Sequence, residues 1–268
     1  MSIRSIVYSI VVVCLCVLPM NSANAVLTVI DVDFEETTPG ADGTATAANL
    51  NQEVTGGTWV ANAIEESQVR TDNGNNVLNV DRGSYDYDLG SFLAAPMGGV
   101  ELSYDTYIQR TAGSANAKKN FFFGTDSDGD EVFRLVLTTD GSANPTNGRL
   151  KYVDAGGTEI IILDGLNSEG GNGIHEERLQ NVRLVFNPTG YDIYIEDVLW
   201  VTDAEYRTAF GSLDGLAMLT LDGTGSADGN ASGAFYDNIL VTAIPEPATI
   251  SLGIFGVAGL LMRRRRSA

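Results

Sequence analysis

The stretch VRLVFNPTGYDIYI, residues 182–195, contains the clearest fold signal in the sequence. Its two halves are short runs of β-branched and aromatic residues in which apolar positions largely alternate with polar ones, the pattern of strands with one buried face. Between them, Asn187, Pro188, Thr189 and Gly190 are residue types that favour tight turns. The stretch therefore predicts a β-hairpin.

Similar strands, separated by turn clusters such as residues 139–141 and 154–157, fill the chain from residue 26 to residue 243. Helical turns are expected only at residues 204–210 and around residues 175–179. No repeating blade unit is found, so the pattern predicts an all-β domain of two antiparallel sheets packed as a sandwich. Besides the hairpin, the predicted strands are residues 26–34, 77–80, 100–108, 120–123, 132–137, 149–153, 159–163 and 235–241.

The order of these strands resembles the concanavalin A-like lectin and glucanase jelly roll, including its laminin-G relatives. The resemblance is carried by VELSYD at 100–105, EVFRL at 131–135, NPTGYD at 187–192 and FYDNILV at 235–241. It implies that the first strand, residues 26–34, lies beside the closing strand, residues 235–241.

The amino terminus has the features of a secretory signal peptide over residues 1–25. Arg4 precedes an apolar run at residues 6–18, and Ala23 and Ala25 supply the small residues of a cleavage site. The run is shorter than the ~20 residues that span a bilayer, which disfavours the alternative of an uncleaved anchor. The mature chain is expected to begin at Val26 and to contain no cysteine, since Cys14 and Cys16 are the only two.

Residues 244–268 form a distinct tail. Pro245, Glu246 and Pro247 precede an apolar stretch at residues 248–262, which four arginines follow, Arg263, Arg264, Arg265 and Arg266. As a helix the stretch would be about 22 Å long, less than the ~30 Å hydrocarbon core of a bilayer. Arginines at the cytoplasmic interface extend the effective span, so the tail predicts a single transmembrane helix.

The tripeptide, the apolar helix and the arginines, in this order at the end of the chain, resemble the PEP-CTERM sorting signal of exopolysaccharide-producing Gram-negative bacteria. The resemblance implies an exosortase as processing partner and an inner-membrane intermediate. It also implies a final location at the cell surface or in the extracellular matrix, where exopolysaccharide is a candidate ligand. A plain membrane anchor is the alternative.

The chain is strongly acidic, with 16 basic and 35 acidic residues and a formal net charge of −19. Setting aside Arg4, Arg263–Arg266 and Glu246 leaves 11 basic and 34 acidic residues, or about −23, between the two signals. Such a charge disfavours nucleic acid as a partner, because nucleic-acid binding depends on cations that neutralise phosphates. Neutral polymers and divalent cations are better candidates.

One acidic stretch has the composition of a calcium loop. Asp126, Asp128 and Asp130 alternate around Gly129, and carboxylate oxygens are ligands for Ca²⁺. The glycine precedes the third aspartate and Leu137 stands at the twelfth position, so the stretch departs from the EF-hand loop. The alternative is a polar hairpin turn, in which Asp and Gly serve the turn geometry.

Aromatic side chains are candidates for stacking on sugar rings. Tyr85 and Tyr87 form the most site-like pair, because strand alternation would expose either both tyrosines or both neighbours, Asp86 and Asp88, on one face. The other candidate rings are Trp59, Tyr104 and Trp200.

No catalytic residue is assigned. The single histidine, His175, excludes a multi-histidine zinc site, and no nucleophile-elbow, Walker A or dinucleotide-binding motif occurs. Carboxylates two or four apart on strands, at residues 31–35 and 192–196, leave a polysaccharide hydrolase or lyase as the alternative. The sequence therefore predicts an exported structural or glycan-binding β-sandwich rather than an enzyme.

Overall fold

The structure is a computed structural model. It describes residues 27–41, 43–51, 57–65, 67–72, 74–94, 100–109, 119–139, 148–166, 179–208, 215–223 and 233–243. These residues belong to one compact unit, Leu27–Glu246. The predicted signal peptide, the predicted tail and His175 lie outside the described residues.

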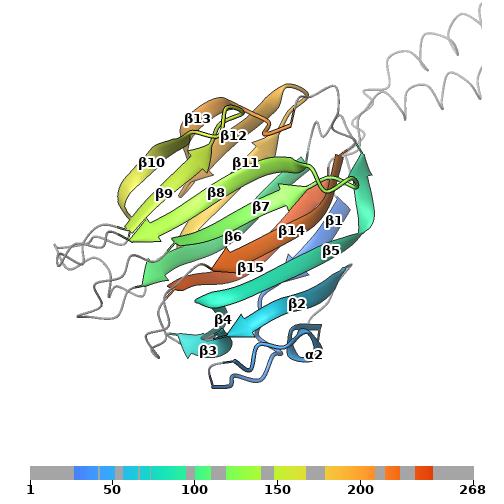
Figure 1. The fold of residues 1–268 in the computed structure, drawn as a ribbon, viewed down its shortest axis with the longest axis vertical. Helices are drawn as coiled ribbons and strands as arrows, with labels where there is room; N and C mark the ends of the chain where they lie inside the picture. Colours follow the sequence, from blue (N-terminus) through green and yellow to red (C-terminus); the bar gives the residue numbers. More distant parts are fainter. Residues whose placement is uncertain are drawn as a thin grey trace, which may run out of the picture. The chain divides into compact units, whose positions relative to one another are not determined.

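Two antiparallel sheets form the two layers of the fold (Figure 1). In the eight-stranded sheet, β1 (Leu27–Val32) pairs with β15 beside the main path of strands. That path is β13 (Val198–Glu205), β12 (Gly190–Ile195), β11 (Gln180–Phe186), β6 (Val100–Gln109), β15 (Gly233–Ala243), β4 (Asn75–Val80) and β3 (Gln68–Asp72).

The seven-stranded sheet faces the viewer in Figure 1. Its order is β10 (Glu159–Leu166), β9 (Gly148–Val153), β8 (Glu131–Thr139), β7 (Lys119–Thr125), β14 (Gly215–Gly223), β5 (Arg82–Ala94) and β2 (Thr58–Glu65). The prediction of an all-β domain with two antiparallel sheets is thus confirmed.

Aromatic side chains join the two layers. Tyr104 of the eight-stranded sheet packs edge-on against Phe122 of the seven-stranded sheet, with ring centroids 4.4 Å apart. Phe122 also contacts Phe133 and Tyr236, and all four residues are buried. Pairs of this geometry contribute about 0.5–1.5 kcal/mol beyond the burial of their surface. The alternation seen in the sequence therefore sends one side of each central strand into a shared core.

The predicted hairpin forms between β11 and β12, with Val182 opposite Ile195 and Phe186 opposite Tyr191. The Asn187 side chain accepts hydrogen bonds from the backbone N–H groups of Thr189 and Gly190, at 3.1 and 2.9 Å. The hydrogen bonds of these backbone N–H groups are thus made within the turn itself, as its residue types predicted.

The first and closing strands also pair as expected. Leu27 lies opposite Ala243, and Val32 lies opposite Ile239. Residues 234–236 of β15 pair with β4 along the same edge of β15 that pairs with β1. One long strand thus pairs with two short strands end to end.

The helical turn expected at residues 204–210 is wrong for residues 204–208, and residues 209 and 210 lie outside the described residues. Ala204 and Glu205 end β13, and residues 206–208 are not helical. Ala204 is buried opposite Tyr191, so pairing with β12 overrides the local preference. Within the described ranges the single helix is the short α2 (Ala47–Leu50), which the sequence analysis missed. In the same ranges no helix has the length and apolar character needed to cross a membrane.

Candidate functional site

The outer face of the seven-stranded sheet brings together the polar residues of β5 and its neighbours. Tyr85 and Tyr87 point inward and are 0% and 1% exposed, whereas Asp88 is exposed and Asp86 half-buried on the outer face. The proposed stacking of Tyr85 and Tyr87 on a sugar is therefore corrected, because both rings lie in the hydrophobic core. Of the two alternatives that alternation left open, the structure exposes the aspartates.

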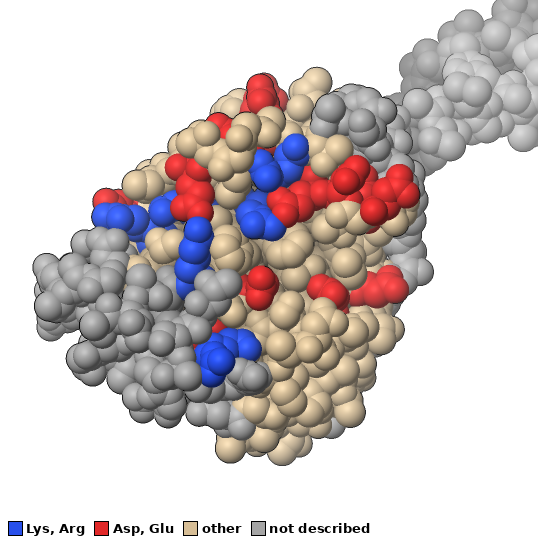
Figure 2. Space-filling view, viewed as in Figure 1, with Lys and Arg blue, Asp and Glu red and all other residues tan. Residues whose placement is uncertain are grey.

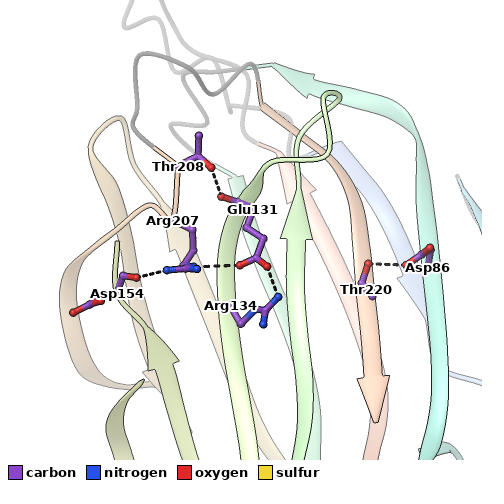
Figure 3. Close-up of polar contacts among 7 residues, drawn as sticks. All are labelled: Asp86, Glu131, Arg134, Asp154, Arg207, Thr208 and Thr220. Carbon is purple, nitrogen blue, oxygen red and sulfur yellow. Dashed lines mark hydrogen bonds and ion pairs between the residues drawn. The ribbon is translucent and has the colours of Figure 1, made fainter. Parts of the chain in front are cut away.

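Asp86 is held in position from both sides. Its Oδ1 accepts a hydrogen bond from the Thr220 hydroxyl of β14 at 2.7 Å, seen in Figure 3, and its Oδ2 accepts from the Asn62 amide of β2 at 2.6 Å. Val60, which pairs with Asp86, is 47% exposed. Three strands thus fix one carboxylate beside an open apolar side chain.

A second carboxylate, Asp222, lies two residues beyond Thr220 on β14 and so faces the same side. Burial raises the pKa of Asp222; the nearby Arg134 opposes this rise and the charge of Asp86 adds to it. The strand register places the two aspartates diagonally across β5 and β14, since Asp86 pairs with Thr220 and Asp222 pairs with Ser84.

Two phenylalanines of β7 add an apolar component to this face. Phe121 and Phe123 are half-buried on the outer side, while Phe122 between them enters the core. The Arg134 guanidinium of β8 lies 5.0 Å from the Phe121 ring centroid and 4.8 Å from that of Phe123. The Lys119 ammonium lies 5.1 Å from the Phe121 centroid. These are cation–π distances.

A polar network fixes the start of β8 at the rim of this face (Figure 3). Glu131 forms ion pairs with Arg134 and with Arg207, the latter at 3.2 Å. Arg207 also donates to the backbone carbonyl of Asp154 at 2.6 Å, and the Thr208 hydroxyl donates to the Glu131 carbonyl at 2.9 Å. The network ties the segment after β13 to the turn between β9 and β10.

The stretch predicted as a calcium loop is the β7–β8 turn. Asp126 Oδ1 accepts from the backbone N–H groups of Asp128 and Asp130, at 3.1 and 2.8 Å, and Gly129 has a positive φ of 87°. Asp126 is buried, whereas Asp128 and Asp130 are exposed. The part of the chain that the structure describes contains no group of three or more Asp, Glu, His or Cys residues arranged for a metal ion.

The other candidate rings divide between core and surface. Trp59 and Tyr104 are buried, whereas Trp200 on the edge strand β13 is 48% exposed. Trp200 belongs to the other sheet, so it is separate from the face that contains Asp86.

The opposite outer face has a similarly held carboxylate. Asp105 of β6 accepts hydrogen bonds from the side-chain amides of Asn181 and Asn238, each at 2.8 Å. The carboxylates considered as alternatives at residues 31–35 and 192–196 also belong to this sheet or its loops. Glu35 accepts from the backbone N–H of Asn76 and Glu196 from that of Asn181.

Sequence reasoning missed Asn62, Thr220 and Asp222, because β2 and β14 were not among the predicted strands. Phe121 and Phe123 lay within a predicted strand. Alternation along the strand placed Phe121 and Phe123 on the face opposite Phe122, and the structure shows that Phe122 is the buried one.

No protein family model matches the chain, and no curated protein matches it. The solved CBM2 module of the evolved Dit of Lactobacillus casei BL23 phage J-1 is 16% identical, with a TM-score of 0.50, over 82% of this chain and 97% of that one. A carbohydrate esterase from the Shiga toxin-encoding bacteriophage phi24B is 10% identical, with a TM-score of 0.51, over 82% and 99%.

The receptor binding domain of the botulinum neurotoxin C/D mosaic serotype is 11% identical, with a TM-score of 0.50, over 85% of this chain and 50% of that one. At such low identities the likeness concerns the fold alone. The fold is a jelly-roll-like β-sandwich, which agrees with the predicted lectin and glucanase architecture.

Proposed function

We propose that the chain is an exported polysaccharide-binding protein that contacts its ligand with the outer face of the seven-stranded sheet. The observation that carries the proposal is the fixed carboxylate of Asp86, which lies in one row across the sheet with Thr220 and the outward-facing Phe123. The carboxylate and amide groups would bond sugar hydroxyls, and Phe121 and Phe123 would contact the apolar sugar face. The phage carbohydrate esterase, whose name states a saccharide substrate, has the same fold and supports this ligand class.

The opposite face supplies a matched control for the test. Asp86 and Asp105 are each held by two side-chain donors, at 2.6–2.8 Å, on opposite faces of the sandwich. Affinity gel electrophoresis and calorimetry against a panel of neutral and acidic polysaccharides are expected to show binding that Asp86→Ala weakens about tenfold, equivalent to ~1.4 kcal/mol. Asp105→Ala is expected to leave the affinity within twofold of wild type. Equal loss in both variants would contradict a site on the seven-stranded sheet.

The proposal includes sorting through the carboxyl-terminal tail. The sequence of Pro245, Glu246, Pro247, an apolar stretch and Arg263–Arg266 supports processing by an exosortase at the inner membrane, followed by transfer to the cell surface or matrix. Intact mass of the extracellular protein tests this. A species from Val26 to residues 245–247 that forms only in the presence of the enzyme is expected. Persistence of the arginine cluster in both hosts would indicate a plain anchor.

A polysaccharide hydrolase or lyase is the second candidate, and the Asp86–Asp222 pair favours it. Residues diagonally opposed on neighbouring strands are ~7–8 Å apart, near the separation of carboxyl groups in inverting glycosidases. A raised pKa on Asp222 suits a general acid. New reducing ends or unsaturated products that disappear in Asp222→Asn would support this candidate. A bound polymer of unchanged length would support binding alone.

A further inference from the structure

An exposed apolar run lies on β13, the edge strand of the eight-stranded sheet. Among the described residues, three of the six exposed large hydrophobic side chains are consecutive. They are Val198, Leu199 and Trp200, at 58%, 46% and 48% exposure. Single exposed apolar side chains are ordinary on protein surfaces, but a run of three leaves contiguous apolar surface in water unless a partner covers it. The run therefore marks β13 as a candidate contact surface.

The pairing of β13 with β12 explains why successive side chains are exposed. Leu199 lies opposite Tyr194 and Val201 lies opposite Ile193, so Trp200 has no opposite residue and forms a β-bulge. A bulge interrupts the alternation of a strand and re-aims the extra side chain. Ile193 is buried in the core, so Tyr194 and Leu199, one position away, belong to the outer face.

The neighbouring strands extend this apolar run into a patch. Leu199, Tyr194 and Arg183 form one row across β13, β12 and β11. The Arg183 guanidinium lies 4.0 Å from the Tyr194 ring centroid, which is a cation–π contact. Tryptophan, tyrosine and arginine are the residue types that dominate the energetics of protein–protein interfaces. We call Arg183, Tyr194, Val198, Leu199 and Trp200 the β13 patch.

The turn that precedes β13 is held in a strained conformation. Glu196 and Asp197 have positive φ angles of 51° and 60°, which residues other than glycine adopt only where their surroundings hold them. The Glu196 backbone N–H donates to the Asn181 carbonyl, and the Glu196 carboxylate accepts from the Asn181 N–H, both at 3.0 Å. Asp197 pairs with Arg183 at 3.6 Å. A patch fixed in this way loses little conformational entropy when a partner binds.

Carboxylates surround the β13 patch. Residues 180–205, which form β11 to β13 and their turns, contain one basic residue, Arg183, and five acidic residues. The acidic residues are Asp192, which is half-buried, and Glu196, Asp197, Asp203 and Glu205, which are exposed. The face of the seven-stranded sheet differs, because lysines and arginines lie among its acidic side chains (Figure 2). A partner of the β13 patch therefore meets an apolar centre with a negatively charged border.

This charge distribution selects among the possible partners. A second copy of the chain would bring the same carboxylates together, and like charges at contact oppose association. A polysaccharide requires groups that bond its hydroxyls, and the side chains of Val198 and Leu199 offer none. A polypeptide with apolar side chains between lysines or arginines matches both the centre and the border.

We infer that the β13 patch binds a basic polypeptide segment. Apolar side chains of the segment cover Leu199 and Trp200, and its flanking cations meet the carboxylates at the border. The inference is independent of the proposed polysaccharide site, because β13 and the strand of Asp86 belong to different sheets.

A phage-displayed library of random dodecapeptides is the probe. The library is selected on the immobilised full-length chain, and peptides that bind the Leu199→Gln variant equally well are removed by counter-selection. The remaining peptides are expected to be net positive and to contain several aliphatic or aromatic residues. Their affinity should be about tenfold lower at 500 mM than at 50 mM NaCl, since salt screens the charged border. An empty selection, or remaining peptides that are neutral or acidic, would overturn the inference.

Ile161 provides a matched control for the patch. It is 51% exposed on β10, the edge strand of the other sheet, against 48% for Trp200. In calorimetry with the selected peptides, Trp200→Ala is expected to lower the affinity about tenfold, and Ile161→Gln is expected to leave it within twofold. Equal losses in the two variants would contradict a site at β13. Thermal denaturation of every variant, Leu199→Gln included, shows that the fold is retained.

Two further measurements address the other occupants. Sedimentation velocity over a range of concentrations tests for a second copy, and a dimer that Leu199→Gln abolishes would overturn the inference. Iodide quenching of the Trp59→Phe variant, in which Trp200 is the remaining tryptophan, tests for a glycan. Protection of Trp200 by polysaccharide but by none of the peptides would overturn the inference. Protection by the peptides alone is the expected result.

Discussion

Asp237 of β15 lies directly opposite Asp105 of β6 within the eight-stranded sheet. The register of β15 shifts after Asp237, and Asn238 has a positive φ of 48°, so this bulge brings two successive residues to the same carboxylate. Asp237 is almost fully buried. Burial raises its pKa to about 7, the backbone N–H of Asn238 opposes the rise, and Asp105 adds to it.

The raised pKa of Asp237 makes stability depend on pH. The unfolded carboxyl, with a pKa of 3.8, releases its proton first, so this group's contribution to the free energy of unfolding falls as pH rises from about 4 to about 7. Asp237→Asn cannot ionise and is expected to match wild type near pH 4. At pH 8 it should be more stable by about 2–4 kcal/mol, at roughly 1.4 kcal/mol per pKa unit. Urea unfolding at pH 4, 6 and 8 measures the difference, and a difference independent of pH would contradict the assignment.

Thr220 is expected to act by orienting Asp86. Thr220→Val removes the hydroxyl that donates to Asp86 and should weaken polysaccharide binding about five- to tenfold, while lowering stability by about 1 kcal/mol. Thr220→Ser keeps the donor and should restore affinity. Calorimetry on the three proteins tests this, and failure of the serine variant to restore binding would indicate a packing role for the threonine methyl group.

Turn geometry and calcium binding give different expectations for Asp126. We propose that its carboxylate serves the turn, since it accepts two backbone N–H groups. Asp126→Ala should then lower stability by about 1–2 kcal/mol, with or without calcium. A melting temperature that rises with calcium in wild type but not in the variant would instead support an ion held by Asp126, Asp128 and Asp130.

The two tryptophans are expected to report separately on core and surface. Trp59 is 2% exposed and packs against Tyr87, whereas Trp200 is 48% exposed on β13. The Trp200→Phe variant should therefore emit at shorter wavelength than Trp59→Phe, and iodide should quench only the latter strongly. Trp200→Ala should cost much less stability than the ~3–5 kcal/mol expected for Trp59→Ala. Quenching of Trp200 emission by polysaccharide would place the binding site on the other sheet.

Local chemistry made much of the fold predictable. The β11–β12 hairpin followed from Asn187 and Gly190, whose contacts lie within four residues of each other. Short runs of β-branched and aromatic residues likewise predicted β1, β4, β6 to β10 and β15. Ala204 was assigned wrongly because its place in β13 depends on pairing with Tyr191, a contact that its neighbours in sequence do not specify.

The sequence by itself determined the alternation of side chains along the strands and the acidic composition, and its two terminal patterns are the basis of the sorting proposal. Alternation along residues 85–88 required tyrosines and aspartates to lie on opposite faces, but the period is the same for either choice. Only packing between the sheets decided that Tyr85 and Tyr87 enter the core, because burying two rings is favourable and burying two carboxylates is costly. The grouping of charged residues on β7–β9 also depends on tertiary structure. Strand pairing places β7, β8 and β9 side by side, and Arg207, which follows β13, reaches Glu131 of β8.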